Sequence, residues 1–284
     1  MGLESMKGML AKAGKEQYGV GAFNTVDYAS TKAAVTAAEE LAAPIIIQTS
    51  VKTVQLWGHA TVVTWMKDIA ANSPVPVALH LDHCKDPDFI RQCIDAGWTS
   101  VMIDASAKPF EENLAITRQV FEMADAAGVG LEAELGEIGG VEDDKSVADE
   151  DAYLADPDKA EMFCKDLPLA VFAPAIGTAH GVYKGEPKIA FDRLEEIAKR
   201  TGLPIALHGG TGLSDDVFKR CIALGCAKVN ISTQLKYTFI DSFVNYHQDH
   251  QAYEPVKVLT AQMEAIRKTV VDYIRLFGSE GKGK

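Results

Sequence analysis

The stretch Pro76-Val77-Ala78-Leu79-His80-Leu81-Asp82-His83 decides the fold class, because an apolar run of strand length ends in charged and imidazole side chains. Two later apolar runs lead to the same kind of residue, with His180 in Gly177-Thr178-Ala179-His180-Gly181 and His208 in Leu207-His208-Gly209-Gly210-Thr211-Gly212. Histidines so distant in the chain cannot meet on one helix or loop. Only a fold that gathers many strand ends at one place brings them together.

Short apolar or β-branched runs recur along almost the whole chain, each followed by a loop and a segment with helical periodicity. We expect strands at Tyr18–Phe23, Pro44–Gln48, Pro76–Leu81, Ser100–Ile103, Gly130–Leu135, Leu169–Ala173, Pro204–Leu207 and Ala227–Ile231. Tyr28–Leu41, Pro109–Ala127 and Ser214–Leu224 are predicted helices between them, the last with a Ser N-cap. Eight such repeats predict an α/β fold, a (β/α)8 TIM barrel, with a doubly wound open sheet as the main alternative.

The chain of 284 residues is long enough for one large barrel or two ordinary domains, and no Pro/Ser/Gly-rich linker divides it. We therefore predict a single barrel domain over residues 1–284. Two further helices, Thr233–His247 and Val256–Phe277, make residues 233–284 a C-terminal addition that either covers the barrel or forms an oligomer contact. A homodimer or homotetramer is expected.

Composition excludes several classes of protein. The net charge of −12 disfavours nonspecific binding to nucleic acid or to an anionic membrane. The longest apolar stretch, Leu41–Ile47, is far shorter than the roughly 20 residues of a membrane helix. The sequence starts without a basic-then-apolar leader, so a cytoplasmic location is expected. Five cysteines without a Cys-x-x-Cys pair indicate buried, reduced thiols.

Polar residues end or follow the predicted strands, where barrel enzymes place their catalytic groups. A buried polar group without a partner costs about 1–3 kcal/mol, so these residues indicate one shared site. They are Asn24, Ser50, Asp82, His83, Asp104, Ser106, Glu134, His180, His208 and Asn230.

The three histidines His83, His180 and His208 suit a catalytic zinc ion, which takes three protein ligands and keeps one position open. One such histidine alone is more often structural, but three at equivalent strand ends favour a metal site. Asp82 directly precedes His83, and on an extended strand end the two side chains point different ways. We therefore expect Asp82 to donate or accept a proton instead of binding the metal.

Two glycine-rich or hydroxyl-rich loops predict a phosphate site made of backbone N–H groups and a helix N-terminus. They are Gly209-Gly210-Thr211-Gly212 after the seventh strand and Asn230-Ile231-Ser232-Thr233 after the eighth. Gly181 and Lys184 are candidates for a further N–H group and a charge. A Gly-Gly turn by itself is more often only a tight loop.

The segment from Glu137 to Asp151 is acidic and carries a glycine pair. One interpretation is a solvated surface loop. The other is a mobile lid whose carboxylate Glu142 enters the site on closure and moves a proton.

The chain resembles the class II zinc-dependent ketose-bisphosphate aldolases, in the branch with tagatose- and fructose-bisphosphate aldolases, from about Gly21 to Gly278. Seven ordered motifs carry the resemblance: Gly21–Asn24, His80–His83, Met102–Ser106, Glu134–Gly140, Gly177–Gly181, Leu207–Gly212 and Lys228–Thr233. It implies reversible cleavage of a ketose 1-phosphate or 1,6-bisphosphate to dihydroxyacetone phosphate and an aldehyde. The metal takes the place of the Schiff-base lysine of the other aldolase class as electron sink.

The resemblance also implies roles for individual residues. Zinc lies on His83, His180 and His208, Asp82 handles the proton of the C4 hydroxyl, and Glu142 protonates the enediolate carbon. Asp104 and Glu134 are alternate ligands or lie beside the ion. Asn24, Ser50, Lys184, Asn230 and Ile231 are expected near the substrate, and its phosphate lies against Gly181, Gly209, Gly210, Thr211, Ser232 and Thr233. A monovalent cation such as Na⁺ or K⁺ is also expected.

Two departures concern the far end of the substrate. Where relatives carry an Asp-Pro-Arg segment and a later arginine, this chain has Glu254-Pro255-Val256 and Gln262. Arginine is not easily replaced in bidentate phosphate binding. A ketose 1-phosphate with another distal group is thus an alternative, such as 6-deoxy-6-sulfofructose 1-phosphate, which would give sulfolactaldehyde. Lys52, Arg267 or Arg275, from this or a neighbouring subunit, are candidates for the distal charge.

Cys84 stands where relatives often have glycine, which puts the shape of that loop in question.

Two other classes of protein stay open. A zinc hydrolase on a barrel usually carries His-x-His on its first strand, where this chain has Phe23-Asn24. A noncatalytic sugar-phosphate-binding or accessory subunit is the other, and the presence of Asp82 with all three histidines argues against it.

Overall fold

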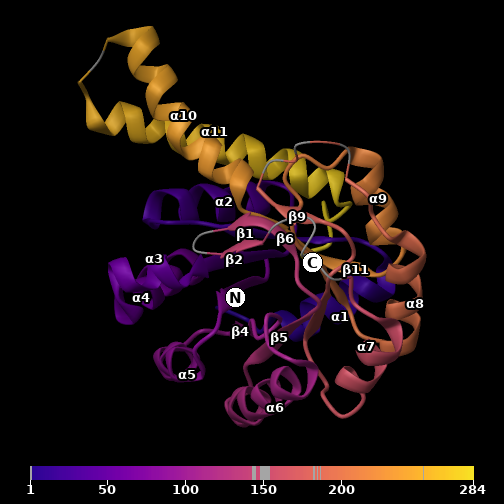
Figure 1. Ribbon diagram of the computed structural model, residues 1–284. Helices are drawn as coiled ribbons and strands as arrows, with labels where there is room; N and C mark the ends of the chain where they lie inside the picture. Colours follow the sequence, from indigo (N-terminus) through magenta and orange to yellow (C-terminus); the bar gives the residue numbers. More distant parts are fainter. Residues whose placement is uncertain are drawn as a thin grey trace.

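Eight parallel strands close into a barrel, in the order β1-β11-β10-β8-β5-β4-β3-β2 (Figure 1). The computed structural model describes residues 2–142, 145–147, 154–181, 183, 185, 187–251 and 253–284. The barrel strands are β1 (Val20–Asn24), β2 (Ile45–Ser50), β3 (Val77–Cys84), β4 (Ser100–Ile103), β5 (Gly130–Leu135), β8 (Val171–Pro174), β10 (Ile205–Leu207) and β11 (Cys226–Ile231). The predicted (β/α)8 barrel is confirmed, and the open doubly wound sheet is excluded.

Helices surround the barrel and connect its strands, as the sequence periodicity predicts. They are α1 (Met6–Glu16), α2 (Tyr28–Glu40), α3 (Val51–Trp57), α4 (His59–Ala70), α5 (Pro87–Ala96), α6 (Phe110–Ala126), α7 (Pro157–Cys164), α8 (Phe191–Thr201), α9 (Asp215–Ala223), α10 (Thr233–His250) and α11 (Pro255–Leu276). Local chemistry fixes their starts, because Asp27 forms a capping box for α2 and the Ser214 hydroxyl accepts from the Val217 N–H at the start of α9.

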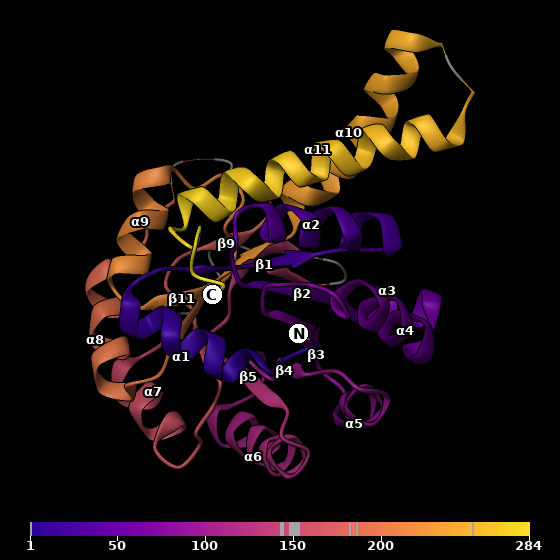
Figure 2. The ribbon, with the colours of Figure 1, turned by 180° about the vertical axis from the view of Figure 1, so that it is seen from behind.

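Helix α1, which the sequence pattern does not predict, covers the end of the barrel at which the strands begin (Figure 2). Its buried residues Met6 and Leu10 pack with inward-facing side chains of the strands, among them Ile46 and Ala78. Ile45 and Ile47, on either side of Ile46 in β2, belong instead to the outer part of the hydrophobic core, between the strands and the helices. Small side chains inside the barrel make room for the helix, and the strands' carboxyl ends remain for a site.

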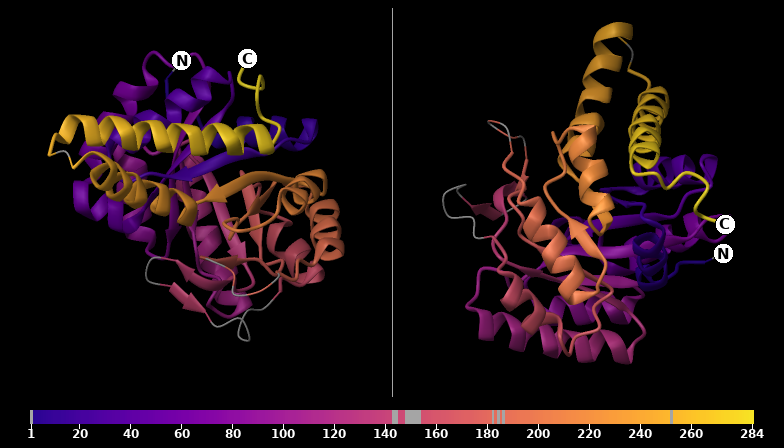
Figure 3. Two further views of the ribbon diagram at one scale, coloured as in Figure 1. Left: turned by 90° about the horizontal axis from the view of Figure 1, so that it is seen from above. Right: turned by 90° about the vertical axis from the view of Figure 1, so that its right-hand side faces the viewer.

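Helices α10 and α11 form an arm that projects beyond the barrel (Figures 1 and 3). The arm carries exposed apolar side chains, including Ile240, Val244 and Leu259. The two helices are joined by a hydrogen bond from Gln262 Nε2 to the Phe239 carbonyl, 3.3 Å long. In the described part of the chain, no helix combines the length and apolar character needed to cross a bilayer.

A second, smaller sheet has the order β7-β6-β9, and the sequence pattern does not predict it. It consists of β6 (Gly139–Glu142), β7 (Lys145–Val147) and β9 (Ala179–His180). β6 pairs in parallel with β9, so that Gly140 lies opposite His180. The segment after β8 therefore returns as a strand beside the segment after β5.

Candidate active site

His83, His180 and His208 come together where the barrel strands end. The ligand atoms of the three rings all lie within 4.8 Å of one another, and His83 Nε2 is 2.9 Å from His208 Nδ1. Zinc–nitrogen bonds of about 2.0–2.1 Å around a tetrahedral ion need nitrogen atoms at such separations. The donor set and its spacing therefore fit one zinc ion.

The backbone at His83 differs from the extended strand end that was expected. His83 has a φ of 47°, in the left-handed region that residues other than glycine rarely adopt. The register between β3 and β4 shifts between Leu81 and Cys84. Regular alternation therefore ends here, and the side chains of Asp82 and His83 contact different groups, Asn24 for Asp82 and Asp104 for His83.

Two side-chain amides hold the carboxylate of Asp82. Asn24 Nδ2 donates to Asp82 Oδ2 at 2.9 Å, and Asn230 Nδ2 donates to Asp82 Oδ1 at 3.4 Å. Gln48 Nε2 donates in turn to Asn24 Oδ1 at 2.8 Å, which fixes the amide of Asn24. The sequence prediction missed Gln48 because it follows three isoleucines in a buried strand. Asp82 itself is 4% exposed, so its orientation depends on these bonds.

Asp104 and Glu134 lie on the other side of the His83 ring. Asp104 Oδ2 is 3.1 Å and Glu134 Oε2 is 3.8 Å from His83 Nδ1. Ser106 Oγ donates to Asp104 Oδ1 at 2.6 Å. His83, Asp104 and Glu134 could also hold an ion among them. This geometry is compatible with both predicted roles of the two acids, as alternate ligands or as partners of His83.

A fully buried group of charges beneath the histidines was also missed. Glu132 Oε1 lies 2.7 Å from His208 Nε2, and Glu132 Oε2 lies 2.9 Å from Lys228 Nζ and 3.3 Å from His80 Nε2. Burial alone would raise the pKa of Glu132, but Lys228 and the two histidines outweigh it and hold that pKa well below its usual range. Burial, with Lys228 adding to it, lowers the pKa of His80.

One signal in the sequence could have found this group. His80 and Asp82, Glu132 and Glu134, and Lys228 and Asn230 each lie two positions apart in an apolar strand. Residues at this spacing face the same side of a strand. A charged residue two positions before a site residue thus indicates a layer of polar groups inside the barrel.

The predicted phosphate loops line one small hollow next to the histidines. Its lining consists of His180, Gly181, Gly209, Gly210, Thr211, Asn230, Ser232 and Thr233. Among the described residues, the buried Ser232 Oγ has no hydrogen-bond partner. Ser232 precedes the N-terminus of α10, where backbone N–H groups favour an anion. Ile231, at the end of β11, is fully buried.

Gly209 and Tyr183 join the loop after β10 to β9. A Cβ at Gly209, whose φ is 65°, would lie 2.5 Å from the Ala179 carbonyl oxygen. Tyr183 Oη donates to the Gly209 carbonyl at 2.7 Å and accepts from the Ala179 N–H at 3.0 Å. Close backbone approach therefore brings His180 to His208. The sequence prediction missed Tyr183.

Comparison with known proteins agrees with this geometry. A family model described as fructose-bisphosphate aldolase class-II matches residues 4–282. The chain belongs to the class II fructose-bisphosphate aldolase family. It is 44% identical to the fructose-bisphosphate aldolase of Geobacillus stearothermophilus over 99% of both sequences. It is also 41% identical to the sulfofructosephosphate aldolase of Alkalicoccus urumqiensis, over 99% of this chain and 98% of that one.

Solved structures of aldolases share the fold. The crystal structure of the YdjI aldolase from Escherichia coli K12 superposes with a TM-score of 0.88 at 30% identity. The superposition covers 99% of this chain and 100% of that chain. The resemblance to class II aldolases inferred from the seven motifs is confirmed.

Ser50, Glu142 and Lys184 are not part of the hydrogen-bonded cluster that is described around the histidines of this aldolase-family chain. Ser50 ends β2 and its hydroxyl oxygen accepts from the Thr53 N–H at 3.3 Å, so Ser50 is the N-cap of α3. Glu142 ends β6, but its side chain lies outside the part of the structure that is described, and so does Lys184. Because β6 runs beside β9, the backbone that leads to Glu142 passes close to His180.

Two arginines considered for the distal charge lie far from the mouth of the barrel in this chain. Arg267 forms ion pairs with Glu264 and with Glu40, at the end of α2. Arg275 pairs with Glu280, and the neighbouring Phe277 carbonyl accepts from the Gly19 N–H, just before β1 begins. Both arginines are therefore near the ends of the strands opposite the histidines, and neither serves the site of its own chain.

The two positions at which the resemblance led us to expect arginine do not supply the charge either. Gln262 is fully buried between α10 and α11, whereas Val256 is 69% exposed on the arm. Lys52, in α3 directly after β2, is exposed at the same end of the barrel as the site. Of the three predicted distal cations, Lys52 alone has a suitable place in its own chain.

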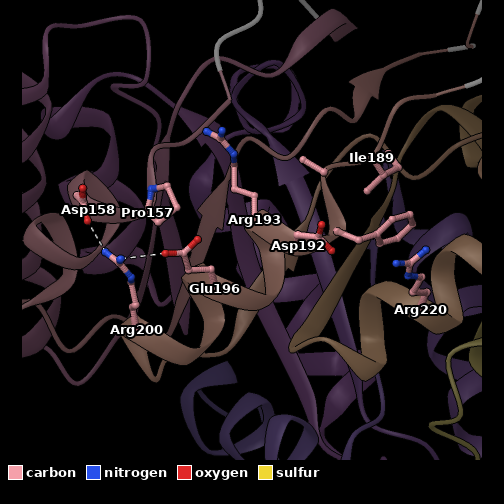
Figure 4. A pocket seen from close by; sticks show the side chains of 10 residues that line it. Pro157, Asp158, Ile189, Asp192, Arg193, Glu196, Arg200 and Arg220 are labelled. Atoms are coloured by element: carbon pink, nitrogen blue, oxygen red, sulfur yellow. Dashed lines mark hydrogen bonds and ion pairs between the residues drawn. The ribbon is translucent and has the colours of Figure 1, made fainter.

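A groove larger than the small hollow lies elsewhere. It measures about 600 Å³, lies on the outer wall at α7, α8 and α9, and contains none of the histidines (Figure 4). Arg200, in its wall, is paired with Asp158 and Glu196, and Arg220 stacks on Phe191. Its charges are largely engaged with one another, unlike the facing nitrogen atoms of the histidine cluster.

Proposed function

We propose that the chain is a zinc-dependent aldolase that reversibly cleaves a fructose- or tagatose-type ketose 1-phosphate or 1,6-bisphosphate to dihydroxyacetone phosphate and an aldehyde. One observation carries the proposal: three imidazoles with metal-binding spacing lie beside an aspartate held by two amides. A binding subunit would have no need for a proton acceptor fixed so tightly next to the metal ligands, and a barrel zinc hydrolase usually carries His-x-His on its first strand, where this chain has Phe23-Asn24.

Residues of the chain perform the proton transfers in the proposed mechanism. Asp82 takes the proton of the substrate's C4 hydroxyl as the C3–C4 bond breaks. When bound to His83, His180 and His208, zinc supplies a Lewis acid for the charge that develops on the substrate oxygens. Asn230, next to both Asp82 and His208, places an amide N–H near the reacting carbons. Glu142 returns a proton to the carbon.

The small hollow is the proposed place of the substrate's phosphate. Glycine N–H groups, the Ser232 hydroxyl and the N-terminus of α10 all favour an anion there. This arrangement supplies the local positive potential that an anionic substrate needs on a chain of net charge −12. The proposal also includes Na⁺ or K⁺ bound by carbonyl oxygens of the same loops. It further places Asn24 and Ser50 at the substrate.

The part of the site that would bind the distal group of the substrate favours a second candidate substrate. Neither Val256 nor Gln262 replaces the arginines expected for a distal phosphate, and Arg267 and Arg275 lie at the other end of the barrel. One relative at 41% identity is named a sulfofructosephosphate aldolase. A 6-sulfonated ketose 1-phosphate is therefore the second candidate.

The test is a panel of fructose 1,6-bisphosphate, tagatose 1,6-bisphosphate, fructose 1-phosphate and 6-deoxy-6-sulfofructose 1-phosphate. Release of dihydroxyacetone phosphate is followed with and without a chelator. We expect cleavage of at least one bisphosphate or the sulfonated sugar at 10⁴ M⁻¹s⁻¹ or about that value, loss of activity with chelator, and recovery with zinc. Cleavage that persists in chelator contradicts the zinc mechanism, and no release from any sugar favours the noncatalytic alternative.

A homodimer or homotetramer remains our proposal for the assembly. The arm of α10 and α11 exposes the apolar side chains of Ile240, Val244 and Leu259, and exposed apolar surface is typical of contact surfaces. A neighbouring subunit is also a source of a cation at the distal end of the site, for which Lys52 is the candidate from the same chain.

A further inference from the structure

We propose that the buried pair Glu132 and Lys228 is a positioning unit that sets the tautomer of His208 and, at the same time, the orientation of the Asn230 amide. The inference rests on the proposed function, because it assigns His208 to the metal and Asn230 to the substrate. One ion pair thereby prepares a metal ligand and a substrate contact together.

The first half concerns His208. An ionised carboxylate only accepts hydrogen bonds, so the contact of 2.7 Å between Glu132 Oε1 and His208 Nε2 places the ring proton on Nε2. His208 Nδ1 then keeps its lone pair. This atom is the one that lies 2.9 Å from His83 Nε2, inside the metal-binding group. Glu132 thus selects the tautomer that binds a metal through Nδ1.

The second half concerns Asn230. The ammonium of Lys228 only donates, and its Nζ lies 2.6 Å from Asn230 Oδ1. The oxygen of the amide must therefore face Lys228, and the NH₂ group must face the opposite way. There, Asn230 Nδ2 donates to Asp82 Oδ1 at 3.4 Å. Without Lys228, the amide loses the shorter of these two contacts and only the longer one to Asp82 favours this orientation.

Glu132 and Lys228 reach each other across the inside of the barrel. They belong to β5 and β11, between which β8 and β10 intervene in the strand order. Both side chains are fully buried. Apolar residues of similar volume often stabilise a protein as well as a buried ion pair does. Stability therefore does not account for the pair, whereas its contacts to His208 and Asn230 do.

Glu132→Gln tests the His208 half, because an amide has one accepting and one donating end. Lys228 can only donate, so the Gln oxygen must face Lys228 and its NH₂ group must face His208 Nε2. That nitrogen must then accept, which moves the ring proton to Nδ1 and blocks the metal. We expect zinc affinity, measured on the apoprotein by chelator competition, to fall about 10–100-fold.

The double variant Glu132→Gln/Lys228→Met separates the two halves. With the ammonium gone, the Gln oxygen can turn to accept from His208 Nε2, so zinc affinity should return to within about threefold of the parent. Since Asn230 has lost its donor, kcat should stay lower by about 10²-fold. Nitrogen-15 NMR of labelled histidine in the apoprotein should show the tautomer change in the single variant and its reversal in the double variant.

Glu112→Gln is the matched control, because it removes a carboxylate paired with Lys108 on the surface of α6. It should bind zinc as the parent does. Parent-like zinc affinity in Glu132→Gln, or a double variant that binds zinc no better than the single one, overturns the proposal. If the single variant does not fold, a double variant with parent kcat overturns it as well. Zinc and NMR readouts do not depend on cleavage, so a parent without aldolase activity refutes the proposed function separately.

Discussion

At the scale of single residues, the site depends on side chains that are held before any substrate arrives. Asp82 accepts from Asn24 and Asn230, and Gln48 fixes Asn24 in turn. The sequence predicted Asp82, Asn24 and Asn230 from their places at strand ends. It could not predict which amide bonds to which oxygen, because the three residues lie on three different strands.

Replacing Asp82 with Ala removes the proposed proton acceptor but none of the three histidines. We expect kcat to fall by about 10²–10⁴-fold while zinc content, measured by atomic absorption, stays near one ion per chain. Asp95→Ala, at an exposed position of α5, is the control and should retain activity. Unchanged turnover in the Asp82 variant would refute its role.

At the scale of elements, backbone conformations that depart from regular strands bring the histidines together. His83 has a left-handed backbone at a register shift of β3, and such conformations cost of order 1–3 kcal/mol unless the surroundings hold them. His180 belongs to β9, outside the barrel wall, and reaches His208 where Gly209 allows the close approach of Ala179. Periodicity in the sequence finds regular elements and therefore passes over these departures.

Gly209→Ala should damage the metal site through β9. The new Cβ would lie 2.5 Å from the Ala179 carbonyl oxygen, so the strand that carries His180 has to move. We expect a loss of unfolding free energy greater than about 1 kcal/mol and weaker zinc binding, both measured on purified protein.

Gly202→Ala is the matched control for this change. Gly202 has nearly the same φ, 63°, but among the described residues beyond its own chain neighbours no atom comes within 4 Å of the position that a Cβ would take. The variant should share the backbone strain without the clash and keep the zinc affinity of the parent. Equal zinc affinities in the two variants would contradict the role of Gly209.

At the scale of the whole molecule, burial determines the state of the thiols. All five cysteines are free and buried, as the sequence predicts. Burial raises the pKa of Cys164 to about 12 and raises that of Cys93 as well. In the unfolded chain, these thiols ionise near pH 9, whereas in the folded protein they stay neutral. The stability gained from neutral burial is thus complete below pH 9.

Above that pH, the unfolded state binds fewer protons than the folded state, so the free energy of unfolding should fall as pH rises from 9 toward 12. Each such thiol contributes about 1.4 kcal/mol per pH unit in this range. Urea unfolding of the apoprotein at pH 8, 9, 10 and 10.5 measures the slope. In Cys164→Ala, the free energy of unfolding should fall less steeply with pH, by about 1.4 kcal/mol per pH unit, which corresponds to one proton. Identical slopes in the variant and the parent would contradict the assignment.

Strand and helix periods and the residues at strand ends are local features of the chain, so the barrel, the family and the gathering of the three histidines could be predicted from the sequence. The closed barrel decided what no local pattern contains: helix α1 covering the end where the strands begin, the left-handed His83, and the meeting of Glu132 with Lys228 across its interior. It also placed Arg267 and Arg275 at the end opposite the site. These features depend on contacts between residues distant in the chain, which exist only once the strands have closed.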